Sequence, residues 1–281
     1  MKLLLVPTDF SPLADNAMKY AVAMAEAINA KIMLLNVYQI PISYTEVPLA
    51  SISLDQLQEL SEEKLSETKK NINTITGGKI HIYTESKLGD VSEEVEKLCQ
   101  TLDPFAIIIG TRGVSGLGRF FMGSNTLSIL SKVDTPVYVI PPGATFKKYK
   151  KIGLATDMHD VVENTPIEPI KNLVGIFNAE LHVLNVDFEH QNFTPATPEE
   201  TLNLDTMLAG LNPIYDFIEN KDVDEGLSGF SEKNNLDLLI TLPKKHSFIE
   251  KIFEKSHTRD LIHQTTIPLL CIQNRKKELA A

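Results

Sequence analysis

Glycines gather between residues 110 and 123, in the first half of this 281-residue sequence. Gly110 and Gly113 follow the apolar run 106–109, and Gly123 stands at the other end of the segment. Glycine allows positive φ and close backbone approach, so amide N–H groups can turn inward and surround an anion. The spacing therefore indicates a loop that binds phosphate.

Ser124 and Asn125 follow this loop and open a predicted helix. The first turn of a helix offers free N–H groups and the positive end of the dipole, and Ser124 adds a hydroxyl. Arg119, within the loop, is a further candidate for a phosphate contact. The alternative is a flexible glycine-rich loop in which Ser124 only caps the helix and Arg119 is solvated.

Two familiar nucleotide motifs do not match. Gly113-x4-Gly118 is followed by Arg119 and Phe120, so the lysine and the Ser/Thr of a P-loop are missing. A G-x-G-x-x-G pattern does not follow the first predicted strand, which argues against a dinucleotide fold.

Apolar runs alternate with amphipathic segments and predict the elements that position this loop. In the first half we expect strands at 2–7, 31–37, 79–85, 106–110 and 136–140, and helices at 15–30, 54–74, 91–101 and 124–132. In the second half we expect strands at 151–156, 180–186, 218–220, 237–242 and 268–273, and helices at 165–177, 199–218, 224–233 and 256–264.

The two halves repeat one unit, since Thr8-Asp9 recurs in register as Thr156-Asp157. We therefore predict an α/β protein of two tandem Rossmann-like domains, 1–145 and 146–281. Each is expected to hold a five-stranded, mostly parallel sheet with helices on both faces. The two last strands, 136–140 and 268–273, are apolar edge strands, so we expect them to pack together as an intrachain pseudo-dimer. A homodimer is a further option.

The formal net charge is −10, and both halves are acidic. This balance argues against a nucleic-acid backbone or an anionic membrane as partner, because either would be repelled. Apolar stretches stay shorter than the roughly 18 residues of a membrane span. Cys99 and Cys271 lie one in each half without a paired framework, which favours a reducing, cytoplasmic location.

Val6-Pro7-Thr8-Asp9, together with Gly110-x2-Gly113-x9-Gly123-Ser124-Asn125, resembles the nucleotide-binding pattern of the universal stress protein family. The resemblance covers nearly all of the first half and, more weakly, the second. It implies a tandem member with an adenine nucleotide alpha hydrolase-like fold. If the family's strand order 3-2-1-4-5 applies, Asp9 and Gly110 lie on facing sides of one crevice.

The resemblance also implies a ligand, ATP or AMP, with Mg²⁺ accompanying ATP. The acid that ends the first strand would lie beside the ribose and adenine, the backbone after the second strand would meet the adenine edge, and the glycine loop would hold the ribose and phosphates. These positions are Pro7, Thr8 and Asp9, then Val37, then Gly110, Gly113, Gly123, Ser124 and Asn125. Asp9 could instead only cap the turn that follows the strand.

The matching region of the second half, from Leu242 to Lys255, contains no glycine, and Pro243 fixes φ there. Nucleotide binding in the family's manner is not expected in this half. Lys244 and Lys245 are either solvated or hold some other anion. The second half also contains His246, His257 and His263, but none of their spacings is a helical i, i+4 ligand pair, so we expect no metal site.

The function expected from these patterns is that of a cytoplasmic stress-response or regulatory protein that binds ATP or AMP in its first domain. A slow ATP hydrolase or nucleotide transferase is one alternative, and an interaction scaffold without nucleotide is another. A Ser-His-Asp order or an activated nucleophile is not recognisable, so catalysis beyond weak ATP hydrolysis is not expected.

Overall fold

The computed structural model describes residues 1–40, 53–111, 124–188, 194–243 and 266–273. In the first half, strands alternate with helices: β1 (Leu3–Pro7), α1 (Pro12–Ile28), β2 (Lys31–Tyr38), α2 (Leu54–Thr76), β3 (Ile82–Leu88), α3 (Val91–Leu102), β4 (Ala106–Gly110), α4 (Ser124–Lys132) and β5 (Val137–Ile140). The second half continues with β6 (Lys151–Ala155), α5 (Val161–Asn164), α6 (Ile167–Phe177), β7 (Glu180–Asp187), α7 (Thr197–Met207), β8 (Ile214–Glu219), α8 (Val223–Lys233), β9 (Leu238–Thr241) and β10 (Leu269–Cys271).

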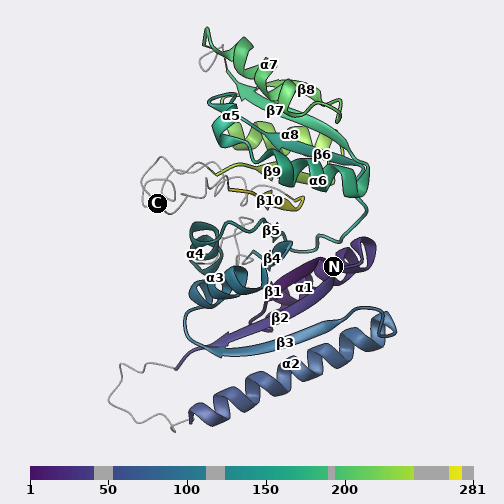
Figure 1. The fold of residues 1–281 in the computed structure, drawn as a ribbon, viewed down its shortest axis with the longest axis vertical. Coiled ribbons are helices and arrows are strands. Elements are labelled where there is room, and N and C mark those ends of the chain that lie inside the picture. The colour runs from purple at the N-terminus through teal and green to yellow at the C-terminus, as the bar shows by residue number, and fades with distance from the viewer. Residues whose placement is uncertain (41–52, 112–123, 189–193, 244–265, 274–281) are drawn as a thin grey trace.

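All these strands form one ten-stranded sheet, which runs the length of the molecule (Figure 1). The order is β3-β2-β1-β4-β5-β10-β9-β6-β7-β8. Within each half the neighbouring strands are parallel and follow the order 3-2-1-4-5. The predicted α/β class, strand order and five-stranded sheet of each half are confirmed.

The halves join at the seam between β5 and β10, the only antiparallel pairing among the described strands. Leu269 lies opposite Val139, and Cys271 lies opposite Val137. The predicted contact between the two last strands is thereby confirmed. Each covers the apolar edge that the other would expose, which removes a site for aggregation.

Helices cover both faces of the sheet because alternate strand residues point to opposite sides. Leu4 and Val6 of β1 belong to one buried cluster with residues of α1, α2, α6 and α7. Leu5, between them, belongs to a second cluster with residues of α3, α4 and α8. The core therefore consists of two apolar layers separated by the sheet.

The connection between β5 and β6 packs against both halves. Phe146 lies edge-on to Tyr20 of α1, with ring centroids 5.4 Å apart, and 6.1 Å from Phe177 of α6. The Tyr149 hydroxyl is buried and lies 2.7 Å from the Tyr20 hydroxyl. Burial raises the pKa of both phenols above the ordinary value. We propose that the boundary between the two domains, 1–145 and 146–281, lies within this packed connection.

The prediction of one helix at 199–218 is wrong. The helix α7 ends at Met207, and the strand β8 begins at Ile214 and pairs with β7. Gly210 and Asn212 both adopt positive φ, and Pro213 follows, so the helix cannot continue. The strand expected at 218–220 is therefore the end of a strand that starts earlier.

Other boundaries differ less. The helix expected from residue 15 begins at Pro12, a favoured first helical position, after Ser11 as its cap. The helix expected at 165–177 is α6, which begins at Ile167; the short helix α5, which ends at Asn164 before it, was not predicted. The helix expected at 256–264 lies outside the described residues.

Candidate functional site

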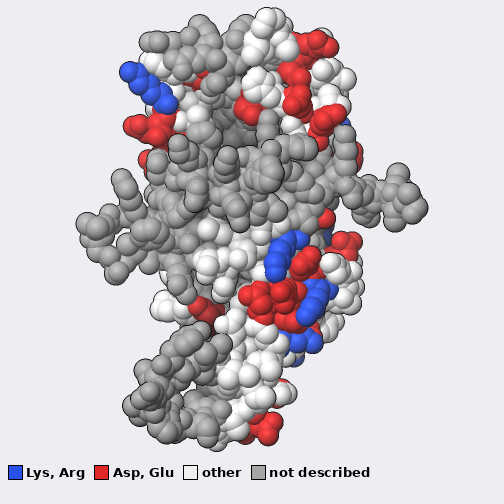
Figure 2. All heavy atoms as spheres, turned by 90° about the vertical axis from the view of Figure 1, so that its left-hand side faces the viewer, with Lys and Arg blue, Asp and Glu red and all other residues white. Residues whose placement is uncertain are grey.

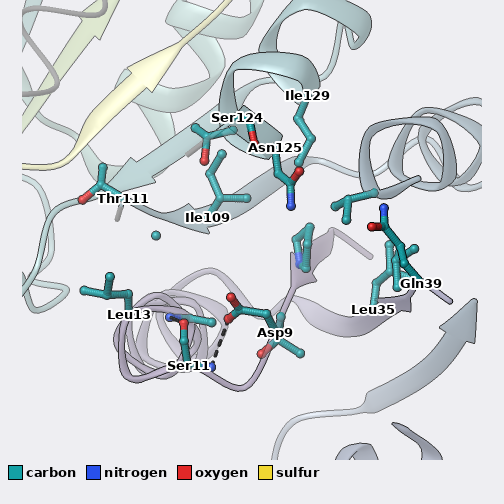
Figure 3. A pocket seen from close by; sticks show the side chains of 17 residues that line it. Asp9, Ser11, Leu13, Leu35, Gln39, Ile109, Thr111, Ser124, Asn125 and Ile129 are labelled. Carbon is teal, nitrogen blue, oxygen red and sulfur yellow. Dashed lines mark hydrogen bonds between the residues drawn. The ribbon is translucent and has the colours of Figure 1, made fainter. Parts of the chain in front are cut away.

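A pocket of about 330 Å³ opens where β1 and β4 end, between the start of α1 and the start of α4 (Figure 3). This is the carboxyl edge of the parallel strands, where open α/β sheets bind ligands. Asp9 reaches it from the segment after β1, and Asn125 reaches it from α4. The volume lies within the range of small-molecule sites.

The segment after β1 is held in a fixed turn. The Thr8 amide donates to the Leu35 carbonyl at 2.8 Å, and the Phe10 amide donates to the Thr8 hydroxyl at 3.0 Å. The Asp9 carboxylate accepts from the Ser11 amide at 3.0 Å, and Phe10 adopts a φ of 61°. We call residues Thr8 to Ser11 the lip of the pocket. The turn fixes the position of the Asp9 carboxylate, whose side chain remains exposed.

Gly110 ends β4 beside the first turn of α1. A Cβ atom on Gly110 would lie 2.7 Å from the Leu13 carbonyl oxygen, which is closer than real Cβ contacts. Its φ is not in the left-handed region, so close approach and not positive φ requires glycine here. The missing side chain lets the two sides of the pocket meet.

Thr111 follows Gly110 and lines the same pocket. Its hydroxyl is buried and is one of the few such atoms in the described residues without a hydrogen-bond partner. An unpaired buried hydroxyl is costly, so a polar ligand group would stabilise it. This property, together with the polar ends of Ser124 and Asn125, fits the phosphate or ribose of a nucleotide.

The helix α3 forms another wall of the pocket through Val91. Asp90 caps this helix by accepting from the Ser92 and Glu93 amides. The pKa of the Asp90 carboxyl is held below its ordinary value, and the main cause is the hydrogen bond from the Ser92 side chain. α3 therefore begins at a fixed, charged position next to the crevice.

Two ion pairs lie on the helices α3 and α4. Lys97 lies 2.6 Å from Glu94, and Lys132 lies 3.7 Å from Glu93. Both helices lie on the left-hand side of Figure 1, and Figure 2 shows acidic and basic side chains interspersed on that face. Exposed pairs of this kind contribute little to stability.

The structure brings together every described residue of the predicted site: Pro7, Thr8, Asp9, Val37, Gly110, Ser124 and Asn125 all line this pocket. Gly113 and Gly123 lie outside the described residues, as does Arg119. The role of these residues in nucleotide binding stays a prediction.

Sequence reasoning missed Ser11, Gln39, Val91, Thr111 and Thr126, which also line the pocket. Thr111 could have been found from its place beside Gly110. Ser11 is the N-cap of α1, and a serine followed by proline is a pattern that the sequence itself shows at the start of a helix. Val91 has no local signal, because only the packing of α3 brings it to the crevice.

The second half repeats the lip. The Met158 amide donates to the Thr156 hydroxyl, the His159 amide donates to the Asp157 carboxylate, and Met158 adopts a φ of 55°. The equivalents of the glycine loop, 244–255, lie outside the described residues. The turn is thus common to both halves, whereas the glycines belong to the first.

The described residues contain no group of three or more metal-ligating side chains arranged to hold an ion. Among them there is also no helix with the length and apolar character needed to cross a membrane.

Strand order, crossovers and a crevice at the carboxyl edge define a tandem Rossmann-like α/β protein. The model of the Universal stress protein family matches residues 1–141. The chain therefore belongs to the universal stress protein family.

Individual relatives agree with this assignment. Universal stress protein MJ0531 of Methanocaldococcus jannaschii is 28% identical over 142 residues, which is 50% of this chain and 81% of that protein. The crystal structure of a universal stress protein from Archaeoglobus fulgidus has a TM-score of 0.73 at 17% identity, covering 98% of this chain and 97% of that chain. The functionally unknown protein PA1789 of Pseudomonas aeruginosa gives 0.63 at 12% identity, covering 98% and 93%. The two structures show the tandem fold.

Proposed function

We propose that the protein binds ATP or AMP in the crevice of its first half and acts as a nucleotide-dependent regulator in the stress response. The observation that carries the proposal is the convergence of Asp9, Gly110 and the start of α4 on one pocket. Members of the universal stress protein family commonly bind adenine nucleotides.

Each part of the pocket suits a part of the nucleotide. The Asp9 carboxylate can accept hydrogen bonds from ribose hydroxyls. The start of α4, with Ser124 and Asn125, presents N–H groups and a positive dipole end to phosphate. Apolar walls from Val37 and Ile109 suit the faces of an adenine ring. Mg²⁺ would accompany ATP through its phosphates.

Binding is favoured over turnover by the chemistry of the lining. Asp9 is the only ionisable side chain among the described residues of the pocket, and its carboxylate already accepts from the Ser11 amide. A hydrolase or transferase would need a positioned base or nucleophile in addition. We propose a cytoplasmic location, and the free thiols of Cys99 and Cys271 support it because such thiols are typical of a reducing compartment.

The test is to purify the protein from cells, denature it, and identify the released small molecules by chromatography and mass spectrometry. We expect ATP or AMP, in an amount approaching one molecule per chain. A preparation that releases no nucleotide and takes none up from added ATP or AMP would contradict the proposal.

A further inference from the structure

A chain of buried hydrogen bonds connects the lip to the helix α2. The Asn36 side-chain amide donates to the Thr8 carbonyl at 2.7 Å. The Ser61 hydroxyl of α2 lies 2.7 Å from the Asn36 side-chain oxygen and 2.6 Å from the Ser86 hydroxyl of β3. Asn36 and Ser61 are both buried, with 8% and 4% of their surfaces exposed.

The direction of every bond in this chain is fixed by chemistry. The Thr8 carbonyl can only accept, so it must face the NH₂ group of Asn36. The Asn36 oxygen then faces Ser61 and can only accept as well. Ser61 therefore donates its single proton to Asn36, and Ser86 must donate to Ser61. Loss of the Ser61 hydroxyl would leave the buried Asn36 oxygen without this donor.

A second contact joins the same helix to the lip. The Lys64 ammonium, one turn after Ser61, lies 5.4 Å from the centre of the Phe10 ring. Phe10 follows Asp9 and adopts the left-handed conformation of the turn. α2 thus contacts the lip at Thr8, through Asn36, and at Phe10 directly.

The helix α2 buries few side chains for its length. Over its 23 residues only Ser61, Leu65, Ile72 and Thr76 are buried. The helix lies along β3 at one end of the molecule (Figure 1). A helix held by so few buried side chains depends on each of them, and the polar chain supplies one.

The second half has the first bond of this chain but not the rest. Asn185 donates to the Thr156 carbonyl at 3.0 Å, as Asn36 does to Thr8. Among the described residues, no hydrogen bond joins Asn185 to α7, which has 11 residues against 23 for α2. The serine connection therefore occurs in the half that carries the glycine motif.

We propose that Ser61 is a positioning residue that couples the docking of α2 to ligand binding at the Asp9 lip. The inference rests on the proposed function. A ligand bound at the lip holds Thr8 in place, and through Asn36 it stabilises the docked position of α2. Because such coupling is reciprocal, a change that breaks the polar chain through Ser61 lowers the affinity of the crevice by the factor by which the ligand would stabilise the docked helix through that chain.

The first experiment measures AMP and ATP affinity by calorimetry on the full chain. Loss of one buried hydrogen bond is expected to weaken binding about three- to tenfold in Ser61→Ala. Ser61→Thr, which keeps the hydroxyl, should restore affinity to within about twofold of the original. Ile72→Val is the control, because it removes buried volume from the same helix without touching the polar chain.

The second experiment follows hydrogen exchange in α2 by mass spectrometry, with and without AMP. Nucleotide should slow exchange around Ser61 in the original protein, and this slowing should be lost in Ser61→Ala. The measurement on the original protein stands even if a variant fails to fold.

The outcomes separate the two proposals. If the protein binds nucleotide but Ser61→Ala keeps full affinity, or AMP leaves exchange in α2 unchanged, the coupling is wrong and the binding site stands. Equal weakening in Ile72→Val, or no rescue by Ser61→Thr, also overturns the coupling. If the original protein binds no nucleotide, the proposed function fails and this inference falls with it.

Discussion

Gly110 shapes the crevice through the side chain that it lacks. The backbone of β4 approaches the first turn of α1 so closely that a methyl group would meet the Leu13 carbonyl oxygen at 2.7 Å. The oxygen belongs to the backbone of α1, and the methyl group would be fixed directly to the backbone of β4, so neither can rotate away. The two sides of the pocket would have to separate to admit the group.

We therefore expect Gly110→Ala to lower the free energy of unfolding by about 1–3 kcal/mol, as overpacking does. The displaced side of the crevice should also weaken AMP binding about tenfold, equivalent to about 1.4 kcal/mol. Urea denaturation and calorimetry measure the two effects. Gly175→Ala is the matched control, since open space surrounds this position in α6 and alanine favours a helix. A Gly110→Ala protein as stable as the original would refute the close-approach argument.

Residues of the site were predictable where the chain itself carries the pattern. Asp9 follows an apolar strand, and Gly110 ends another, so the carboxyl-edge rule brings them together. Thr111 and Val91 were not predicted. The first has an ordinary residue type, and the second reaches the pocket only through the packing of α3. The contribution of Val91 depends on tertiary structure, which local spacing does not encode.

The helix α3 depends on the N-cap that fixes its first turn beside the crevice. The Asp90 carboxylate accepts from the Ser92 hydroxyl and from two backbone amides. These bonds form with the ionised carboxylate and hold the pKa of Asp90 below its ordinary value of 3.8. Stability from this cap is therefore present above about pH 3.8 and is lost as the pH falls through the lower pKa of the folded state.

We expect Asp90→Ala to lower the free energy of unfolding by about 0.5–1 kcal/mol at pH 7, the low end for an exposed cap. The difference between variant and original should shrink at pH values below the pKa of the folded state. Denaturant titrations over a pH series measure this. Asp222→Ala, which removes the equivalent cap of α8, is the comparison for a cap distant from the pocket. A difference that stays constant into strong acid would contradict the role given to the ionised carboxylate.

The types and order of the elements could be predicted from apolar periodicity, because buried parallel strands and amphipathic helices leave different patterns. The stretch 199–218 failed because apolar residues there continue at helical spacing past Met207. Asn212-Pro213 was the signal of a break, and the pairing of Ile214–Glu219 with β7 decided the outcome. Whether such a break ends a helix, when the apolar spacing continues beyond it, depends on tertiary contacts.

For the whole molecule, the central feature is that two copies of one unit share a single sheet but keep different sites. Both copies have the lip turn, with Asp9 in one and Asp157 in the other. The glycine pattern occurs in the first copy alone. The chain is thereby its own pseudo-dimer, and we expect one ligand for each pair of units.

This asymmetry provides an internal control for the assignment of the nucleotide to the first crevice. Asp9→Ala and Asp157→Ala remove the same kind of turn hydrogen bond, at 3.0 Å and 3.2 Å, and both side chains are exposed. Loss of this hydrogen bond should cost each variant a similar, small amount of stability. Only Asp9→Ala should lose nucleotide affinity, by about tenfold or more, since a charged acceptor to ribose contributes about 1.5–3 kcal/mol.

The most direct measurement is calorimetric titration of the full chain and of these two variants with AMP and ATP. We expect one nucleotide per chain, binding that is weakened in Asp9→Ala, and binding that is unchanged in Asp157→Ala. Two equivalent sites per chain, or full affinity in Asp9→Ala, would contradict the assignment of the nucleotide to the first crevice.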